Sequence, residues 1–352
     1  MRFVAPKSNI PARSASPRMA KSASLKDIAQ ELGISYSLVS KVLSGKMGNT
    51  GVRTELRDSI ISTARKLNYR PHPVASALKG GRKGAVGVML HPVGEPGSGL
   101  ITSFLRGVSA GLDEAGLRMW LRFFEFDEEL LQHIDQRLRH DVDGLIVAGV
   151  PHPATYAMLN GLHLSGLPIV SMLERDHIPG VTNVSPDRRM QGELAAGHLL
   201  THGCKRIAHI FVPGMQLRYD GSLAIHADHG VELDPQLVYQ ADAYTTATGE
   251  AAVRHWLDRG MKFDGVITQS DPQAAGVINE LTRRGIRVPD DVRVVGVDNS
   301  PFCNAFNVTI TSVTAEMAHV GRLAAELLTR KLDGETVESV KIPPKLVVRN
   351  SA

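Results

Sequence analysis

The stretch from residue 24 to residue 45 reads SLKDIAQELGISYSLVSKVLSG and decides the fold of the N-terminal part of the chain. Ser24 and Asp27 have the spacing of a capping box, in which each side chain bonds to the other residue's backbone N–H at the start of a helix. Gly33 is the residue type that ends a helix in the left-handed conformation, and Ser35 can cap a second helix. The stretch therefore predicts two short helices joined by a tight turn.

Both predicted helices carry apolar residues at helical spacing along one face. In the second helix the outward positions are polar, and they are occupied by Tyr36, Ser37, Ser40 and Lys41. Residues 54–67 predict a third helix, which completes a three-helix unit. A helix-turn-helix of this kind places its second helix in the major groove of DNA, although an ordinary helical hairpin in a protein core shows the same spacing. The segment predicts DNA binding, with these four side chains able to reach base edges.

Charge is distributed unevenly along the chain. Residues 1–84 hold 16 Lys and Arg against 4 Asp and Glu, which gives this part a formal net charge of +12 and the remainder −8, within a total of +4. A basic N-terminal part fits a nucleic-acid partner. Residues 1–22, rich in Pro, Ser and basic residues, predict a disordered arm. Pro71 and Pro73 end the third helix, and the short helix expected after them needs a partner or DNA to form.

Strands and helices alternate from residue 85 onward, which predicts an α/β domain with parallel sheets covered on both faces. A D-G pair precedes a buried strand at residues 143–144 and again at 264–265, so the domain predicts two similar lobes with a cleft between them. The predicted strands fall in two series of four, at residues 85–90, 118–124, 143–149, 167–173, 206–212, 237–242, 264–269 and 292–298.

Polar residues follow several of these strands. Asp271 comes after VITQS, Asp298 ends VVGVD, and Arg218 comes after IFVPGMQL. Ligands of open α/β sheets bind outside the carboxyl ends of the strands, so these three side chains are candidate ligands for a small molecule in the cleft. Solvated loop residues would also occupy such positions.

Several function classes are excluded or disfavoured by the sequence. The motifs of dinucleotide-binding, P-loop, serine-hydrolase and zinc-protease enzymes are absent. The two cysteines, Cys204 and Cys303, lack metal spacing, and the histidines are scattered, so no cofactor and no metal are expected. No apolar run is long enough to span a membrane, and the N-terminus lacks a signal-peptide core. We therefore expect a cytoplasmic protein without enzymatic activity or membrane contact.

An ordered series of motifs resembles the lactose-repressor (LacI/GalR) family of bacterial transcriptional regulators. They are LKDIAQELGISYSLVSKVL, LNYRP, VASAL, HGCKRIAHI, the R-x-x-G of residues 218–221, VVGVDNS and LVVRNS. The resemblance covers residues 24–350. Two departures concern the loop at residues 44–51, which is longer than usual, and Arg53, which stands where the family usually has a serine cap.

The resemblance implies a helix-turn-helix domain followed by a two-lobed, periplasmic-binding-protein-like domain. It also implies the residues that bind DNA, with the apolar Leu78 as a wedge between base pairs; these are Leu25, Ser35, Tyr36, Ser37, Ser40, Lys41, Tyr69, His72, Val74, Ala75 and Leu78. The effector-binding residues that it implies are Ser98, Leu100, Arg218, Tyr244, Asp271 and Asp298. Met172-Leu173 replaces a common carboxylate of the family and Ala315 a common polar residue, so an unusual ligand pocket is expected.

We therefore expect a homodimeric regulator, a repressor of a carbohydrate catabolic operon, that binds palindromic double-stranded DNA and is controlled by a sugar or sugar derivative. A transport-type sugar-binding protein and a regulator with a purine-type co-repressor are the alternatives. The expected domains are an arm (1–22), the helix-turn-helix domain (23–70), a hinge helix with its linker (71–84) and the effector domain (85–350). Its lobes are expected at about 85–184 with 315–340, and at 185–313 with 341–350.

Overall fold

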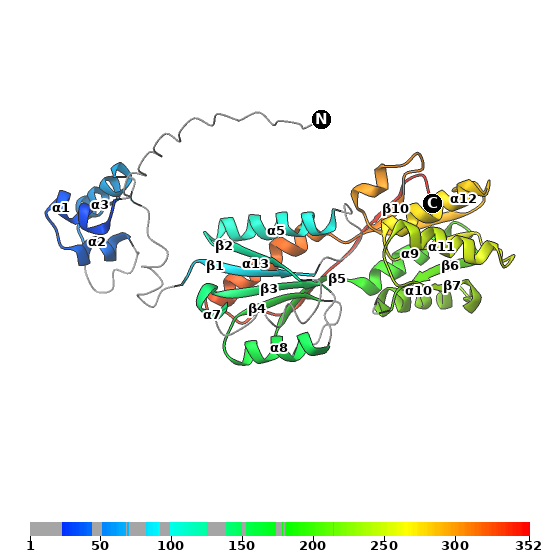
Figure 1. Cartoon of the computed structure of the whole chain (residues 1–352), viewed down its shortest axis with the longest axis horizontal. Coiled ribbons are helices and arrows are strands. Elements are labelled where there is room, and N and C mark those ends of the chain that lie inside the picture. Colours follow the sequence, from blue (N-terminus) through cyan, green and yellow to red (C-terminus); the bar gives the residue numbers. More distant parts are fainter. Residues whose placement is uncertain are drawn as a thin grey trace, which may run out of the picture. The chain divides into compact units, whose positions relative to one another are not determined.

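The computed structural model describes residues 23–43, 51–67, 69, 82–91, 99–124, 138–149, 153–173, 178, 180–213 and 215–352. The chain forms two units, Met1–Gly81 and Arg82–Ala352. Figure 1 shows the order of the elements in each unit. The expected arm, the loop at 44–51 except residue 51, and most of the hinge segment lie outside the described residues.

Three helices make up the described part of the first unit: α1 (Leu25–Leu32), α2 (Tyr36–Leu43) and α3 (Thr54–Lys66). The capping box is confirmed, because the Ser24 side chain accepts from the Asp27 N–H and the Asp27 carboxylate accepts from the Ser24 N–H at 2.7 Å. Gly33 has φ +63° and ends α1 in the left-handed conformation, as expected. Arg53 precedes α3 and makes no side-chain cap. Local sequence signals thus fix the first two helices, and a small shared core holds all three together.

Two six-stranded sheets form the second unit, and each is covered by helices on both faces (Figure 1). The N-terminal sheet has the order β11-β5-β4-β3-β1-β2 and is wholly parallel in its described pairs. Its strands are β1 (Ala85–Leu90), β2 (Arg118–Phe123), β3 (Gly144–Gly149), β4 (Ile169–Leu173), β5 (Thr182–Pro186) and β11 (Val340–Ile342). Helices α5 (Leu100–Glu114) and α13 (Met317–Leu332) pack on one face, and α7 (Leu138–Asp141) and α8 (Pro153–Leu164) on the other.

The C-terminal sheet repeats this plan with the order β12-β10-β9-β8-β6-β7, in which only β12 runs antiparallel. Its strands are β6 (Ile207–Phe211), β7 (Val238–Gln240), β8 (Gly265–Ile267), β9 (Arg293–Asp298), β10 (Thr311–Thr314) and β12 (Leu346–Val347). Helices α9 (Arg188–Thr201) and α10 (Gln216–Asp228) cover one face, and α11 (Thr246–Leu257) and α12 (Asp271–Arg283) cover the other. Short turns of 3-10 helix lie at η1 (Pro235–Leu237) and η2 (Pro301–Asn304).

The two D-G pairs have the same role in the two lobes. The Asp143 carboxylate accepts from the backbone N–H groups of Lys83 and Gly84, just before β1. The Asp264 carboxylate accepts from the N–H groups of Lys205 and Arg206, just before β6. Each aspartate therefore ties the start of its own strand to the start of the neighbouring one, and the predicted likeness of the lobes is confirmed.

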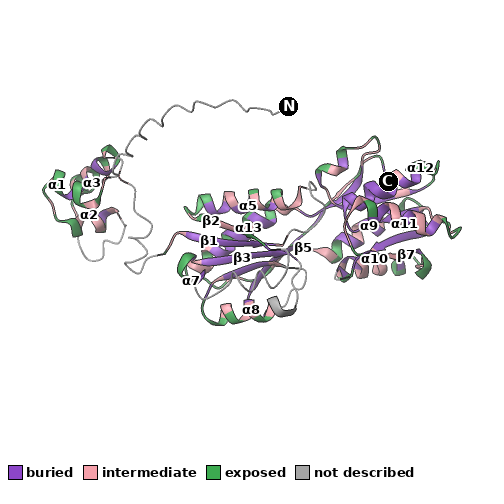
Figure 2. Cartoon of the chain, in the orientation of Figure 1, coloured by how far each residue is buried: buried purple, intermediate pink, exposed green. Residues whose placement is uncertain are grey.

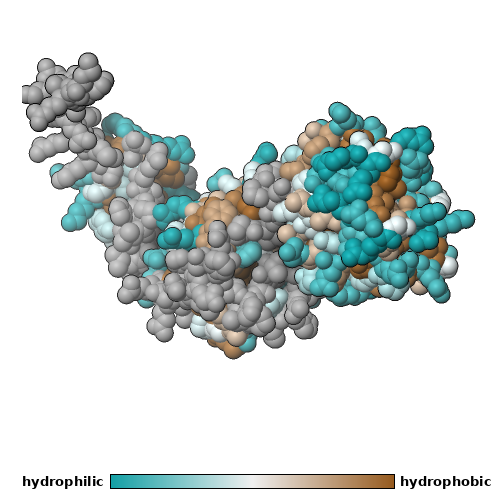
Figure 3. Space-filling model, turned by 45° about the vertical axis from the view of Figure 1, so that its right-hand side comes forward, coloured by the Kyte–Doolittle hydropathy of each residue, from teal (hydrophilic) through white to brown (hydrophobic). Residues whose placement is uncertain are grey.

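The chain passes between the lobes three times: after β5, between β10 and α13, and between β11 and β12. We expected the chain to return to the C-terminal lobe after residue 340. It returns later, after β11, because Val340–Ile342 pairs with β5 in the N-terminal sheet. Figure 2 shows the buried residues concentrated in the strands and on the inner faces of the helices. In Figure 3 hydrophilic side chains predominate on much of the visible surface of the C-terminal lobe. Among the described residues no helix is both long and apolar enough to cross a membrane.

Candidate functional site

Helix α2 presents a polar face and buries an apolar one. Val39 and Val42 are buried, whereas Tyr36, Ser37 and Lys41 are exposed. Tyr36, a large side chain, leaves 43% of its surface exposed. Ser40 is half-buried, at the border of the two faces. The outward residues expected from the helical period thus lie where a base edge could meet them, with Ser40 the least accessible.

The other expected DNA contacts that are described lie around this helix. The Ser35 hydroxyl accepts from the Leu38 N–H at 3.2 Å, so it caps α2 as predicted. Leu25 and Tyr69 are half-buried and pack against the small core. Burial raises the pKa of the Tyr69 hydroxyl, and the neighbouring Tyr36 raises it further. His72, Val74, Ala75 and Leu78 lie outside the described residues.

A pocket lies between the two lobes of the second unit, at the carboxyl ends of their strands, with about 850 Å³ of empty space when the open solvent at its mouth is included. Its wall includes Leu90 at the end of β1, Gly149 at the end of β3, Met172 near the end of β4 and Asp298 at the end of β9. This is where open α/β sheets bind ligands. The cleft predicted from the two-lobed sequence pattern is present.

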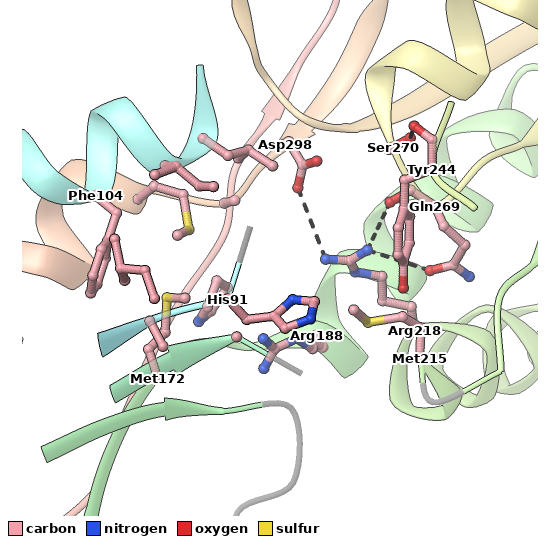
Figure 4. A pocket seen from close by; sticks show the side chains of 18 of the residues that line it. His91, Phe104, Met172, Arg188, Met215, Arg218, Tyr244, Gln269, Ser270 and Asp298 are labelled. Carbon is pink, nitrogen blue, oxygen red and sulfur yellow. Dashed lines mark hydrogen bonds and ion pairs between the residues drawn. The ribbon is translucent and has the colours of Figure 1, made fainter. Parts of the chain in front are cut away.

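Arg218 lines this pocket and is held by hydrogen bonds to its neighbours (Figure 4). Its Nε donates to Gln191 Oε1 and its Nη1 donates to the Gln269 carbonyl, both at 2.8 Å. Its Nη2 lies 4.0 Å from Asp298 Oδ1. These contacts fix the guanidinium plane, so its charge is presented in one orientation. The loose pair with Asp298 sets a donor and an acceptor side by side, which suits a hydroxyl group.

Backbone strain accompanies Asp298. This residue has φ +107° and the next, Asn299, has φ +51°, although neither is glycine. Such conformations cost of the order of 1–3 kcal/mol each and persist where the surrounding structure imposes them. Glu316, which precedes α13 where the chain passes from the C-terminal lobe to the N-terminal one, has φ +50°. The strained residues thus lie where the chain passes the pocket and where it changes lobe.

Asp271 does not lie on the pocket wall, contrary to expectation. Its side chain is fully buried, and its carboxylate accepts from the Ser300 N–H at 2.6 Å and from the Ser312 hydroxyl at 2.5 Å. Burial raises the pKa of this carboxyl, and the hydrogen bonds from Ser312 and Ser300 oppose that rise. A Cβ at Gly296 would lie 2.5 Å from Asp271 Oδ1, so the glycine of VVGVD leaves room for the carboxylate. The rule that ligands bind at the carboxyl ends of strands placed Asp271 at the correct edge of the sheet, but its side chain points into the C-terminal lobe.

The remaining expected effector residues are placed as follows. Tyr244 and Leu100 line the pocket, from the loop before α11 and from the start of α5. Ala315 is also on its wall, next to the lobe crossing. Ser98 lies outside the described residues.

Several wall residues were not among the candidates from sequence. Gln269 is the last residue of the predicted strand 264–269, Ser270 directly follows it, and His91 directly follows β1. The rule that ligands bind at the carboxyl ends of strands could therefore have found all three. Arg188, in the first turn of α9, and Phe104, in α5, gave no such signal, because their place on the wall depends on how the lobes meet. Among the described residues, no group of three or more His, Cys, Asp or Glu could hold a metal ion.

Comparison with known proteins agrees with the two kinds of domain. Residues 24–72 match the model for bacterial regulatory proteins of the lacI family, and residues 196–352 match that for a periplasmic binding protein-like domain. A ribose operon repressor from Halalkalibacterium halodurans is 27% identical over 338 residues, covering 93% of this chain and 96% of that protein. A solved complex of the transcriptional regulator CelR with cellobiose is 27% identical, with a TM-score of 0.67, and covers 94% of this chain and 100% of that one. The lac repressor dimer bound to operator shows the same fold, with a TM-score of 0.78, 20% identity and coverage of 94% and 99%.

The fold and the two sites together define a DNA-binding transcriptional regulator with an effector-binding domain. Residues 24–72 form a helix-turn-helix domain of the lacI family, and the chain as a whole is similar to regulators of that family.

Proposed function

We propose that this regulator represses a carbohydrate catabolic operon, acting as a homodimer on a palindromic operator. The observation that carries the proposal is that one chain joins an exposed, polar recognition helix to a pocket built around the Arg218–Asp298 pair. A dimer presents two recognition helices to two half-sites of a palindrome. The ribose operon repressor and the cellobiose complex among its relatives support a sugar or sugar derivative as effector. No catalysis is assigned to the chain.

The assignment of the recognition helix is tested by fluorescence anisotropy with DNA from upstream of the chain's own gene, against random duplex of equal length. Ser37→Ala and Lys41→Ala should each weaken binding to the specific site by about 1–3 kcal/mol, with less effect on random DNA. Lys262→Ala is the matched control, because Lys262 is an exposed lysine of the other unit, and it should leave both affinities unchanged. Equal losses on both DNAs after the α2 changes would refute the assignment.

The hinge proposal concerns Leu78, which lies outside the described residues. An apolar side chain wedged between base pairs costs a few kcal/mol of unstacking, which the contacts made by bent DNA offset. Leu78→Ala should therefore reduce operator bending and affinity together, while sedimentation still shows a dimer. A variant that dimerises, binds and bends DNA like the wild type would exclude the wedge.

Effector control requires a connection between the pocket and the hinge segment, and α13 is suited to provide it. Met317, at its first turn, lines the pocket. At its other end the Leu332 carbonyl and the Asp333 carboxylate accept from Arg82, the latter at 2.7 Å. Arg82 is the first residue of the effector unit and lies in the linker that ends the hinge segment 71–84. A shift of the lobes around a bound effector would thus be passed along one helix to the hinge, a coupling of two sites.

This coupling is tested with Arg82→Ala and Asp333→Ala. The pair is exposed and therefore weak in itself, so both variants should bind operator and effector with affinities near those of the wild type. The change in operator affinity that effector causes should become smaller by a few fold. Lys331→Ala is a control on the same helix turn, because Lys331 contacts Thr182 rather than Arg82. An undiminished effector response in both variants would exclude α13 as the connection.

A further inference from the structure

Gln191 is a fully buried polar residue in the first turn of α9, and it does not itself line the pocket. Its side-chain amide makes two hydrogen bonds. The Oε1 atom accepts from Arg218 Nε, and the Nε2 atom donates to the Thr314 carbonyl, each at 2.8 Å. One side chain therefore joins the pocket arginine, which belongs to α10, to the last residue of β10.

The chemistry of the two partners fixes which way the Gln191 amide points. An arginine Nε–H only donates, and a backbone carbonyl only accepts. The amide carbonyl must therefore face Arg218 and the amide NH2 must face Thr314, as they do in the structure. Leucine at this position would remove both bonds, whereas glutamate would keep an acceptor for Arg218 and present a second acceptor to the Thr314 carbonyl. The two halves of the amide can thus be separated by substitution.

Thr314 lies where the chain leaves the C-terminal lobe, and it also holds a second passage between the lobes in place. Its N–H donates to the Lys345 carbonyl at 2.8 Å, and its hydroxyl accepts from the Lys345 N–H at 3.0 Å. Lys345 is the last residue before β12, at the end of the segment that returns from β11. Two of the three passages between the lobes therefore meet at the residue to which Gln191 donates.

The remaining passage, from β5 to α9, leads to Gln191 itself. Asp187 directly follows β5 and caps α9, and its N–H donates to the Ile342 carbonyl at the end of β11 at 2.9 Å. The Asp187 carbonyl accepts from the Gln191 N–H at 3.0 Å. Hydrogen bonds thus join all three passages within one small region, and the Gln191 side chain connects this region to Arg218.

We propose that Gln191 is the positioning residue through which an effector bound at Arg218 sets the angle between the lobes. An effector shifts the balance between two lobe arrangements only if it binds them differently. Because the amide is planar and rigid, Arg218 keeps its orientation for the effector in the arrangement that holds Thr314 within reach of Gln191. Motions between lobes are absorbed by a few residues at the ends of elements, as here. The inference rests on the proposed sugar-type effector and adds the step that precedes any shift of α13.

The test measures how strongly a sugar changes operator affinity in the full-length protein. Isothermal titration of ribose, arabinose, xylose, glucose, galactose and cellobiose selects the sugar that binds most tightly. Fluorescence anisotropy with the upstream DNA then gives the operator affinity without this sugar and at its saturation. Saturation separates the size of the response from any loss of sugar affinity.

Two variants separate the two bonds of Gln191. Gln191→Leu and Gln191→Glu should each reduce the sugar-induced change in operator affinity by about threefold or more, because both lose the bond to Thr314. Gln191→Glu should bind the sugar within about threefold of the wild type, whereas Gln191→Leu, which also releases Arg218, should lose about tenfold. Gln216→Leu is the matched control, because Gln216 is exposed on α10 and donates to Asp220. It should keep the wild-type affinity and response.

Amide hydrogen exchange gives a second, local measurement. In the wild type, saturating sugar should slow exchange at Thr314 and Lys345 by about threefold or more, because their mutual bonds open less often. In both Gln191 variants this slowing should disappear, while slowing at residues 269–273, beside Arg218, remains. The measurement on the wild type decides the inference if neither variant folds.

The outcomes separate this inference from the proposed function. An undiminished operator response in the two Gln191 variants, or no slowing at Thr314 and Lys345 in the wild type, would overturn the inference and leave a sugar effector intact. An equal loss of response in Gln216→Leu would also overturn it. If no sugar of the panel binds while operator DNA still does, the sugar-type effector is refuted. Exchange without ligand then decides the inference: it should be faster at Thr314 and Lys345 in Gln191→Leu than in the wild type, and equal rates would overturn it.

Discussion

Asp271 is predicted to hold together the segment that carries Asp298. Its carboxylate accepts from the Ser300 N–H at 2.6 Å and from the Ser312 hydroxyl at 2.5 Å, and thus links α12, the turn after β9, and β10. Ser312 in turn accepts from the Asn299 N–H at 2.9 Å. The strained backbone at residues 298–299 is therefore fixed from one buried group.

Asp271→Ala removes both acceptors and leaves the buried Ser300 N–H without one. Hydrogen bonds to a charged group contribute about 1.5–3 kcal/mol each, so we expect the free energy of unfolding to fall by about 3–5 kcal/mol. Fluorescence of the two tryptophans, Trp120 and Trp256, during urea unfolding is the assay, because both belong to the effector unit and Trp256 packs in the same lobe. A loss below about 1 kcal/mol would show that the linkage is not important.

Asp271→Asn is the matched control, since an amide has nearly the same shape and can still accept from Ser300. Burial raises the pKa of the Asp271 carboxyl in the folded state, so the folded protein holds this proton more tightly than the unfolded chain does. The stabilisation that this produces is complete below the ordinary pKa of aspartate and is lost as the pH rises through the folded-state pKa. The asparagine variant should lack that part of the pH dependence; an identical pH profile in both proteins would contradict the raised pKa.

Three further outcomes are expected. Ser24→Ala removes a helix cap and should destabilise the N-terminal unit by about 1 kcal/mol, seen as faster amide exchange in α1; unchanged exchange would contradict this. Gly192→Ala places a Cβ 1.8 Å from the Arg218 carbonyl and should lower both Tm and the affinity for effector. At Gly197, on the same helix, a Cβ would make only ordinary van der Waals contact with Ile225 at 3.8 Å, so Gly197→Ala should be neutral or raise stability by up to about 1 kcal/mol. Similar effects of the two changes would refute the close packing of α9 on α10. Burial lowers the pKa of His209 to about 3. The stabilisation that comes from keeping His209 neutral is therefore complete above the ordinary pKa of histidine, and below that pKa it decreases by up to about 1.4 kcal/mol per pH unit. Urea midpoints measured between pH 7 and 4.5 should depend less steeply on pH in His209→Phe than in the wild type, and an equal dependence would exclude His209 as a source of acid sensitivity.

Sequence alone determined the features that depend on neighbours along the chain. The capping box at Ser24, the left-handed Gly33 and the cap at Ser35 satisfy the backbone groups of the helices they flank, and such bonds span only a few residues. The apolar strands that lie inside the sheets were equally evident, because burial on both faces requires continuous apolar runs. The short strands were missed: β5 reads TNVSP and β10 reads TSVT, and only pairing with a neighbouring strand makes such polar segments part of a sheet.

Tertiary structure alone decided which side chains face the pocket. Sequence placed Asp271 and Asp298 at the same edge of one sheet, yet the first bonds inward to Ser300 and Ser312 and the second points to Arg218. The rule that ligands bind at the carboxyl ends of strands gives only the position of a Cα atom. The direction of the side chain depends on which hydrogen-bond partners the packed elements bring within reach. For the same reason the sequence could not show that Phe104, Met172 and Met317 line one pocket, because they come from α5, β4 and α13 and meet only when these elements pack together.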